Sequence, residues 1–151
     1  MQTITPCLWF DNNLEEAMNF YLSVFKNGKI LNVSRNGDQV FTAEFELNGQ
    51  RLMGLNGGPI FKFTEAISLF VSVKTQAEVD ELWQKLTADG GEESQCGWLK
   101  DKFGLSWQIV PEALGRLLNN PDPVKAGRAM QAMLQMRKLD IAALEKASEG
   151  I

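Results

Sequence analysis

The chain has 151 residues, of which 44% are hydrophobic and 23% charged, a composition typical of one globular domain. The 15 basic and 19 acidic residues leave a formal net charge of -4, and no basic stripe is present, so nucleic acid is not an expected partner. No apolar run approaches the length of a membrane-spanning helix, and the N-terminus lacks the basic and apolar segments of a secretory signal. We therefore expect a cytoplasmic protein without nucleic-acid or membrane partners.

Histidine is absent from the chain, which removes the residue most often used for acid–base catalysis and for metal binding. The two cysteines, Cys7 and Cys96, fit no zinc pattern and no C-x-x-C pair, and we expect both to be reduced thiols. A cysteine nucleophile stays open as an alternative. The sequence shows no positive neighbour for Cys7, and Lys100 and Lys102 near Cys96 are typical of a solvated turn.

The first half of the chain is expected to form one strand, one helix and a meander of three strands. An apolar strand is predicted over residues 3–10. Asn12 followed by Glu15 resembles a capping box and predicts a helix over about 13–26. Two Asn-Gly turns bracket a run in which apolar and polar residues alternate. This pattern predicts antiparallel strands at about 30–34, 41–47 and 52–56.

The second half repeats this order after a break at Gly57-Gly58-Pro59. An apolar strand is followed by a full capping box, Thr75 with Glu78, which predicts the second helix. The repeat aligns Phe20 with Trp83 at equivalent buried helix positions. Further strands are expected near 93–100 and 105–111, joined by a turn at 101–104. Each half therefore corresponds to one β-α-β-β-β unit.

Beyond Pro111 the pattern changes to short helices. They are predicted at Glu112–Leu118, from Pro123 through Arg137 behind the cap Asp122, and from Asp140 to about Ala147. Three methionines of this tail, Met130, Met133 and Met136, are expected as core filler, with a surface against a partner subunit as the alternative.

Strand alternation predicts which side chains share a face of each sheet. On the first strand, one face carries Thr5, Cys7 and Trp9. On the last strand, Ser106 shares a face with Gln108, and Trp107 points to the opposite side, under a helix. In the first meander Glu44 and Glu46 point away from Phe45, which is typical of a solvated strand face.

Several segments together resemble one protein family. They are Ile4-Thr5-Pro6 through Phe10-Asp11, Glu16 to Phe25, Leu55 to Pro59, Cys96 to Gly104, Trp107 to Pro111, and the tail from Val124 to Lys146. Their amino-acid sequences resemble those of the PhnB-like branch of the vicinal oxygen chelate superfamily. This superfamily includes glyoxalases, bleomycin-resistance proteins and dioxygenases. This branch often carries a 3-demethylubiquinone-9 3-methyltransferase label. The resemblance covers nearly the whole chain.

The resemblance implies an α+β fold with two tandem β-α-β-β-β units that form a cupped mixed sheet, followed by a C-terminal helical tail. We expect a vicinal oxygen chelate domain at 1–120, with units at about 1–58 and 66–111. The helical tail at 121–151 is expected to belong to the same domain. Members of the family usually complete the cup by domain pairing or as a homodimer, so a homodimer is expected here.

The resemblance also implies where a divalent metal is held, namely on the first and last strands of each unit. These positions correspond to Thr5, Met53, Ser68 and Gln108, of which only Gln108 is a usual ligand. A lone neutral amide does not hold a catalytic divalent ion, so we expect neither a metal nor another cofactor. The expected lining of a small-molecule cup is Thr5, Cys7, Trp9, Met53, Ser68, Gln108, Glu44 and Trp98. No catalytic residue is assigned.

Three functions remain open from the sequence. The leading hypothesis is a metal-free small-molecule binding protein. The alternative is a superfamily enzyme, such as a lyase, isomerase or dioxygenase, with a nonstandard divalent metal site in which Glu44 and Glu46 accompany Gln108. A third is a structural or interaction protein that uses its methionine-rich tail. Methyl transfer is not expected, because the glycines at 54–58 precede Pro59 rather than a capped helix.

Overall fold

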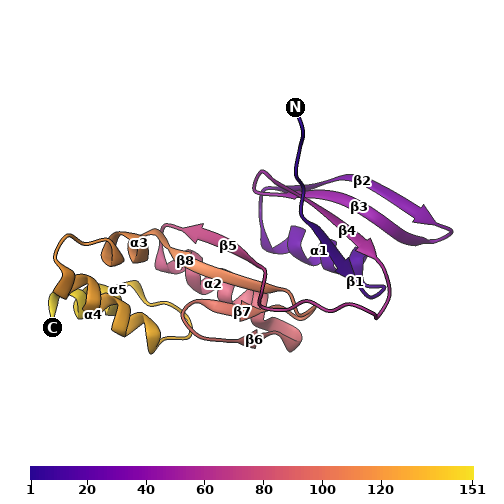
Figure 1. Cartoon of the computed structure of the whole chain (residues 1–151). Coiled ribbons are helices and arrows are strands. Elements are labelled where there is room, and N and C mark those ends of the chain that lie inside the picture. Colours follow the sequence, from indigo (N-terminus) through magenta and orange to yellow (C-terminus); the bar gives the residue numbers. More distant parts are fainter. The chain divides into compact units, whose positions relative to one another are not determined.

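The computed structural model describes residues 1–151 and divides them into two compact units, Met1–Phe63 (unit 1) and Thr64–Ile151 (unit 2). Each unit contains a four-stranded mixed sheet, with strand orders β1-β4-β3-β2 and β5-β8-β7-β6 (Figure 1). In both sheets the first strand of the unit pairs in parallel with the last, and the other pairs are antiparallel. The predicted α+β class with two tandem β-α-β-β-β units is confirmed. No helix of the chain has the length and apolar character needed to cross a bilayer.

Unit 1 consists of β1 (Cys7–Phe10), α1 (Leu14–Val24), β2 (Gly28–Asn36), β3 (Gln39–Leu47) and β4 (Gln50–Asn56). The first strand is shorter than the predicted 3–10. Pro6 has no N–H to donate, and its carbonyl only accepts a hydrogen bond from Met53 N at 2.8 Å. Both Asn-Gly turns form the predicted hairpins, with positive φ at Gly37, Asn48 and Gly49.

The start of α1 differs from the predicted capping box. Asn12 has a left-handed φ of 66°, Asn13 is the N-cap, and Asn13 makes no side-chain capping bond. Instead, Asn56 at the end of β4 caps the helix, because its Oδ1 accepts from Leu14 N at 3.0 Å. The Asn56 amide also donates to the Val40 carbonyl at 2.8 Å. A residue distant in sequence therefore fixes the helix on its sheet.

One face of each helix fills the core of its unit. In α1 the buried residues are Leu14, Ala17, Met18, Tyr21 and Val24, and in α2 (Gln76–Thr87) they are Val79, Trp83 and Leu86. The alignment of Phe20 with Trp83 was wrong by one residue. Tyr21 is fully buried and stacks on Phe45 with ring centroids 6.5 Å apart, whereas Phe20 is half-buried. The buried residues of each helix include a set with the spacing i, i+4, i+7, and Tyr21 and Trp83 each stand at the i+4 position of that set.

Unit 2 contains β5 (Ser68–Val73), α2, the 3-10 turn η1 (Ala88–Gly90), β6 (Glu92–Glu93), β7 (Trp98–Lys100), β8 (Ser106–Pro111), α3 (Glu112–Leu118), α4 (Pro123–Leu134) and α5 (Ile141–Glu149). The predicted Thr75 cap is confirmed, with Glu78 N donating to Thr75 Oγ1 at 3.2 Å. The strand predicted over 93–100 is divided in two. Cys96 and Gly97 adopt left-handed φ values of 59° and 86°, which turn the chain out of the sheet.

The turn at 101–104 is built around a buried carboxylate. Asp101 is 2% exposed and accepts hydrogen bonds from Phe103 N at 2.8 Å and Leu105 N at 3.1 Å. It also accepts from the indole Nε1 of Trp107 at 2.9 Å. Trp107 is a residue of β8 and is buried, as expected for the helix-covered face of the sheet, so the carboxylate links the turn between β7 and β8 to the core.

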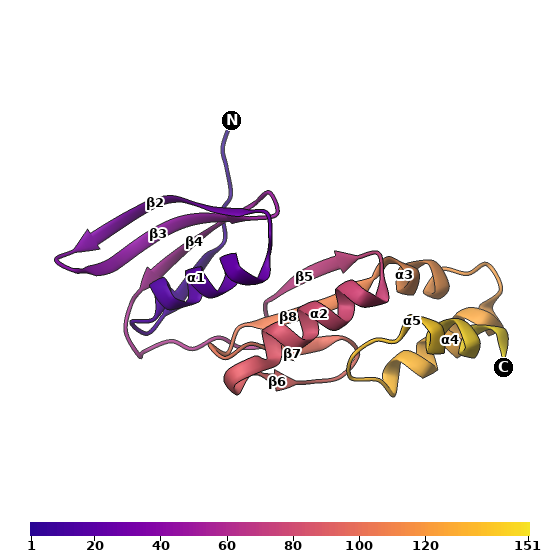
Figure 2. The same ribbon diagram turned by 180° about the vertical axis from the view of Figure 1, so that it is seen from behind.

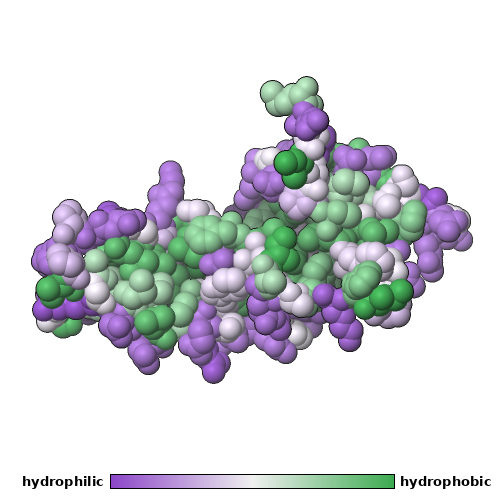
Figure 3. Space-filling model, viewed as in Figure 1, coloured by the Kyte–Doolittle hydropathy of each residue, from purple (hydrophilic) through white to green (hydrophobic).

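The helical tail packs on unit 2 through its own apolar cluster. The cluster consists of Val110, Leu114, Leu117, Ala129, Leu139 and Leu144. Met133 and Met136 pack against it, whereas Met130 remains 40% exposed. Figure 3 shows apolar side chains reaching the surface over α4. The methionine stripe is therefore partly core and partly surface, and α4 ends at Leu134, before the predicted Arg137.

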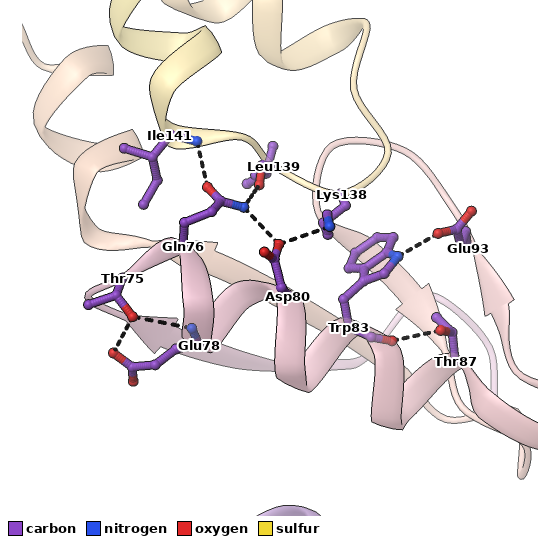
Figure 4. Close-up of polar contacts among 10 residues, drawn as sticks. All are labelled: Thr75, Gln76, Glu78, Asp80, Trp83, Thr87, Glu93, Lys138, Leu139 and Ile141. Carbon is purple, nitrogen blue, oxygen red and sulfur yellow. Dashed lines mark hydrogen bonds and ion pairs between the residues drawn. The ribbon is translucent and has the colours of Figure 1, made fainter.

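The segment between α4 and α5 ties the tail to the rest of unit 2 (Figure 4). The Gln76 side chain donates to the Leu139 carbonyl at 3.0 Å and accepts from Ile141 N at 2.8 Å. Lys138 forms an ion pair with Asp80 at 2.8 Å. The bonds made by Gln76 satisfy backbone groups where no regular element is present, so Gln76 should stabilise the docked tail.

Replacing Gln76 by alanine should loosen this attachment. We expect Gln76→Ala to lower the free energy of unfolding by about 1–3 kcal/mol, because it leaves two backbone groups without their partner. Hydrogen exchange at the Ile141 amide should become faster. The exposed Gln84 on the same helix is the matched control, and Gln84→Ala should change stability by less than about 0.5 kcal/mol. Equal effects of the two substitutions would contradict this assignment.

A second test concerns the buried carboxylate. Asp101→Asn keeps one oxygen acceptor but presents an N–H group to the Trp107 indole N–H, so stability should fall by roughly 2 kcal/mol. Urea unfolding measures this loss. In a Trp107→Phe background, where the opposing donor is absent, the same substitution should be less destabilising by about 1 kcal/mol. An unchanged loss in both backgrounds would show that the indole bond is not coupled to Asp101.

Candidate functional site

In each unit a helix covers one face of the sheet, and we call the other the open face. Figure 2 shows α2 in front of its sheet, and Figure 1 shows the same sheet from its other side. Side chains on the helix face, such as Leu8 and Phe10 of β1, are buried. Cys7 and Trp9 alternate with them and lie on the open face of unit 1.

The open face of unit 1 carries four of the predicted cup residues. Cys7 pairs with Met53 across β1 and β4, and Met53 pairs with Glu44 across β4 and β3, so the three form one row. Trp9 lies in the next row, opposite Leu55. Thr5 was predicted to lie in the first strand, but β1 begins after it. The Thr5 side chain is half-buried.

Trp9 is held in place by the loop that follows β4. Its indole Nε1 donates to the Gly58 carbonyl at 2.9 Å, and its ring meets Phe61 edge-on at a centroid distance of 5.0 Å. Gly57 contacts the ring so closely that a Cβ there would overlap it. These contacts fix the Trp9 ring on the open face, and its indole N–H is already hydrogen-bonded within the chain.

The remaining polar groups of this face are poorly suited to covalent chemistry. Partial burial raises the pKa of the Cys7 thiol, so the thiol is protonated at neutral pH and is a weak nucleophile. Glu44 lies 3.9 Å from Arg51 Nε in a partly exposed ion pair, as expected for a solvated strand face. This pairing directs Glu44 toward a neighbouring side chain rather than toward a metal site.

The raised pKa of Cys7 has a measurable consequence. In the Cys96→Ser variant, which leaves one thiol, the alkylation rate with iodoacetamide should rise with pH through a midpoint above that of an ordinary cysteine. The reason is that the thiolate forms only once the pH exceeds the raised pKa. The same variant unfolded in urea provides the reference. A midpoint at or below this reference would indicate an activated cysteine and would support a nucleophilic role.

On the open face of unit 2, the other three predicted residues come together. The Gln108 amide Nε2 donates to Ser68 Oγ at 3.0 Å. Gln108 is flanked by Trp98 on β7 and by Phe70 on β5, directly opposite it in the sheet. Phe70 is 60% exposed and Trp98 is half-buried. An amide, a hydroxyl and two aromatic rings therefore share this face.

A pocket of about 180 Å³ lies beside Trp98 on unit 2. Lys100 and Glu65 line it and form an ion pair at 2.6 Å, which lowers the pKa of Glu65 and raises that of Lys100. Ser106 is fully buried, and its hydroxyl has no hydrogen-bond partner. Glu92, directly opposite Lys100 in the β6–β7 pair, also lines the pocket.

Sequence reasoning placed Ser106 on the correct face but not at a site, and it missed Glu65, Glu92 and Lys100. Alternation indicates the face of a strand residue, and Ser106 shares that face with Gln108. Nothing local to the sequence indicates that Glu65, which precedes β5, lies over β7. The division of the predicted strand at 94–97 also hid the position of Glu92 opposite Lys100.

The residues at the family's metal positions do not fit a divalent ion. Met53 offers a thioether and Thr5 a hydroxyl in unit 1. In unit 2 the Ser68 hydroxyl already accepts from Gln108, whose carbonyl oxygen is the one remaining acceptor of that amide. The chain contains no group of three or more His, Cys, Asp or Glu residues placed to hold a metal. Zinc and calcium sites need charged or imidazole ligands in larger number.

Comparison with known proteins agrees with this architecture. Residues 2–110 match the family model described as 3-demethylubiquinone-9 3-methyltransferase. The chain belongs to this family. A solved PhnB protein from Bacillus cereus is 36% identical, with a TM-score of 0.68, and the match covers 73% of this chain and 99% of that one. The resemblance to PhnB-like vicinal oxygen chelate proteins is therefore confirmed.

More distant solved structures share the fold. A protein from Pseudomonas aeruginosa is 21% identical with a TM-score of 0.62, and the match covers 74% of this chain and 98% of that one. The fosfomycin resistance protein FosX from Listeria monocytogenes, complexed with Mn(II) and sulfate, is 17% identical with a TM-score of 0.56. That match covers 72% of this chain and 89% of FosX. No curated protein matches the chain in sequence. The match to the family model ends at residue 110, so α3, α4 and α5 lie beyond the matched range.

Proposed function

We propose that this PhnB-like protein binds a small organic molecule on the open faces of its sheets without a metal. The observation that carries the proposal is the pocket beside Trp98, which combines an aromatic ring with the unpartnered hydroxyl of Ser106. Ligand pockets typically have aromatic walls and a few polar groups that orient the ligand. The neighbouring Gln108 and Ser68 add an amide and a hydroxyl to the same face.

The other predicted cup residues belong to this proposal as ligand contacts. On unit 1 they are Thr5, Cys7, Trp9, Met53 and Glu44, which offer apolar, sulfur and aromatic surface with one carboxylate. These side chains are suited to holding a ligand by shape and stacking rather than to activating it. The raised pKa of the Cys7 thiol argues against a nucleophilic role for that residue.

Methyl transfer, which the family description names, is not part of the proposal. The usual S-adenosylmethionine enzymes place a glycine-rich loop between a strand and a helix N-terminus. In this chain the glycines at 57–58 follow β4, and the next regular element is the strand β5 rather than a helix. The loop instead packs against Trp9, whose indole N–H it binds and whose ring it contacts.

The proposed assembly is a cytoplasmic homodimer without nucleic-acid or membrane partners. Both cysteines are free, which is usual in a reducing compartment, and the acidic net charge disfavours nucleic acid. In each sheet the two outer strands, β1 and β2 or β5 and β6, have a neighbour on one side only. Large apolar side chains such as Phe70 and Val124 are exposed. A partner subunit would cover such edges and side chains.

Native mass spectrometry of protein purified without chelator tests these statements together. We expect a dimer mass that carries no metal adduct, and either no ligand or an organic molecule. An ion that bound the native state would stabilise it and raise the melting temperature. We expect no such rise when zinc, manganese, iron or nickel ions are added. Stoichiometric metal that is lost in the Gln108→Ala or Glu44→Ala variant would overturn the proposal. That result would favour the alternative, a superfamily enzyme such as a lyase, isomerase or dioxygenase with a nonstandard metal site.

A further inference from the structure

The pocket beside Trp98 contains a buried polar group that the fold itself does not use. Ser106 is fully buried between its strand neighbours at the base of the pocket, and its hydroxyl has no hydrogen-bond partner. Buried hydroxyl groups almost always have a partner, and an exception calls for water or a ligand at that place. Ser106 therefore marks a position where a bound group would complete the hydrogen bonding.

Trp98 differs from the other three tryptophans of the chain. Those three donate their indole N–H groups to the Gly58 carbonyl, to Glu93 and to Asp101. The indole of Trp98 makes no such bond within the chain, and its half-buried ring forms a wall of the pocket. A free aromatic wall is suited to contact with a ligand, either by stacking or by a cation over its face.

The charges around the pocket leave one carboxylate in excess. Lys100 is matched by Glu65 at 2.6 Å. Glu93 accepts from the Trp83 indole at 2.6 Å and lies 3.7 Å from Arg137. Glu92 lines the pocket and attracts Lys100 opposite it electrostatically, but it forms no ion pair of its own, since Lys100 is paired with Glu65. The unmatched charge is negative, which favours a cationic ligand and disfavours an anionic one.

We propose that this pocket binds the ammonium group of a small organic amine, with the cation against the Trp98 ring, one N–H donated to Ser106 Oγ, and Glu92 as the counter-charge. The inference rests on the proposed small-molecule function and names the ligand class for it. The volume of about 180 Å³ equals that of roughly six water molecules in the liquid, enough for an amine with one ring or a short chain. A larger ligand would place only its amine end here.

Three probes of nearly equal shape separate the charge classes, namely benzylammonium, benzyl alcohol and benzoate. Their binding is followed in ¹⁵N–¹H spectra by the indole signal of Trp98, which is assigned by its loss in Trp98→Phe. We expect benzylammonium to shift this signal saturably at neutral pH. Benzyl alcohol and benzoate should bind at least tenfold more weakly, because the unmatched charge beside Ser106 is negative.

Two variants test the assigned roles. Glu92→Gln removes the excess charge at constant shape, and Ser106→Ala removes the unpartnered hydroxyl; each should weaken benzylammonium binding at least fivefold. Ser106→Ala should not lower the melting temperature, because the hydroxyl has no partner to lose, and this separates a binding role from a structural one. The matched control is Glu112→Gln on α3, an exposed carboxylate away from the pocket, which should leave binding unchanged.

The outcomes distinguish this inference from the function on which it rests. Equal or tighter binding of benzyl alcohol or benzoate at Trp98 would overturn the ammonium class while supporting a small-molecule pocket. Benzylammonium binding that is unaffected by Glu92→Gln and Ser106→Ala would also overturn it. If none of the three probes shifts the Trp98 signal, the ammonium site is wrong, and the organic molecule or metal detected by native mass spectrometry decides the proposed function separately.

Discussion

Each four-stranded sheet is covered by a single helix of its own unit, and this constraint determines the rest of the structure. The first and last strands pair in parallel, so the helix between the first and second strands packs over one face. The sheet-facing side of the helix and most of the large apolar residues at alternate strand positions are buried there. The other face is left with side chains of mixed character. The candidate sites follow from this asymmetry.

Close contacts at two glycines show how tightly the covered regions are packed. Gly54 on β4 lies against Leu14, the first residue of α1, so closely that a Cβ would overlap the leucine. Gly97, with a left-handed φ of 86°, lies against Leu139, and a Cβ there would be 2.9 Å from the leucine side chain. The first contact seats the helix of unit 1, and the second seats the tail of unit 2. In both, the missing side chain is what permits the approach.

The chemistry of the open faces departs from that of a metalloenzyme on the same fold. Where the family's metal positions fall, the side chains are hydroxyl, thioether and amide groups, and two of them are already hydrogen-bonded to each other. Charged side chains lie elsewhere on these faces, in the Glu44–Arg51 pair of unit 1 and around the Lys100–Glu65 pair and Glu92 of unit 2. A fold that elsewhere holds Mn(II), as in FosX, here offers groups suited to binding an organic molecule.

The sequence by itself determined the α+β class, the tandem units, the hairpin turns and the cap at Thr75, because these depend on periodicity and on residues a few positions apart. It failed at Asn12, since the cap of α1 comes from Asn56, and at Phe20, since which helix residue meets the sheet depends on the exact rotation of the helix. Alternation placed Ser106 and Gln108 on one face, and the family resemblance added Ser68 to the same cup. Only the tertiary structure decided that Ser106 lacks a partner and that Glu65 pairs with Lys100 beside it, because contacts between strands and a distant loop are set by packing and leave no local pattern.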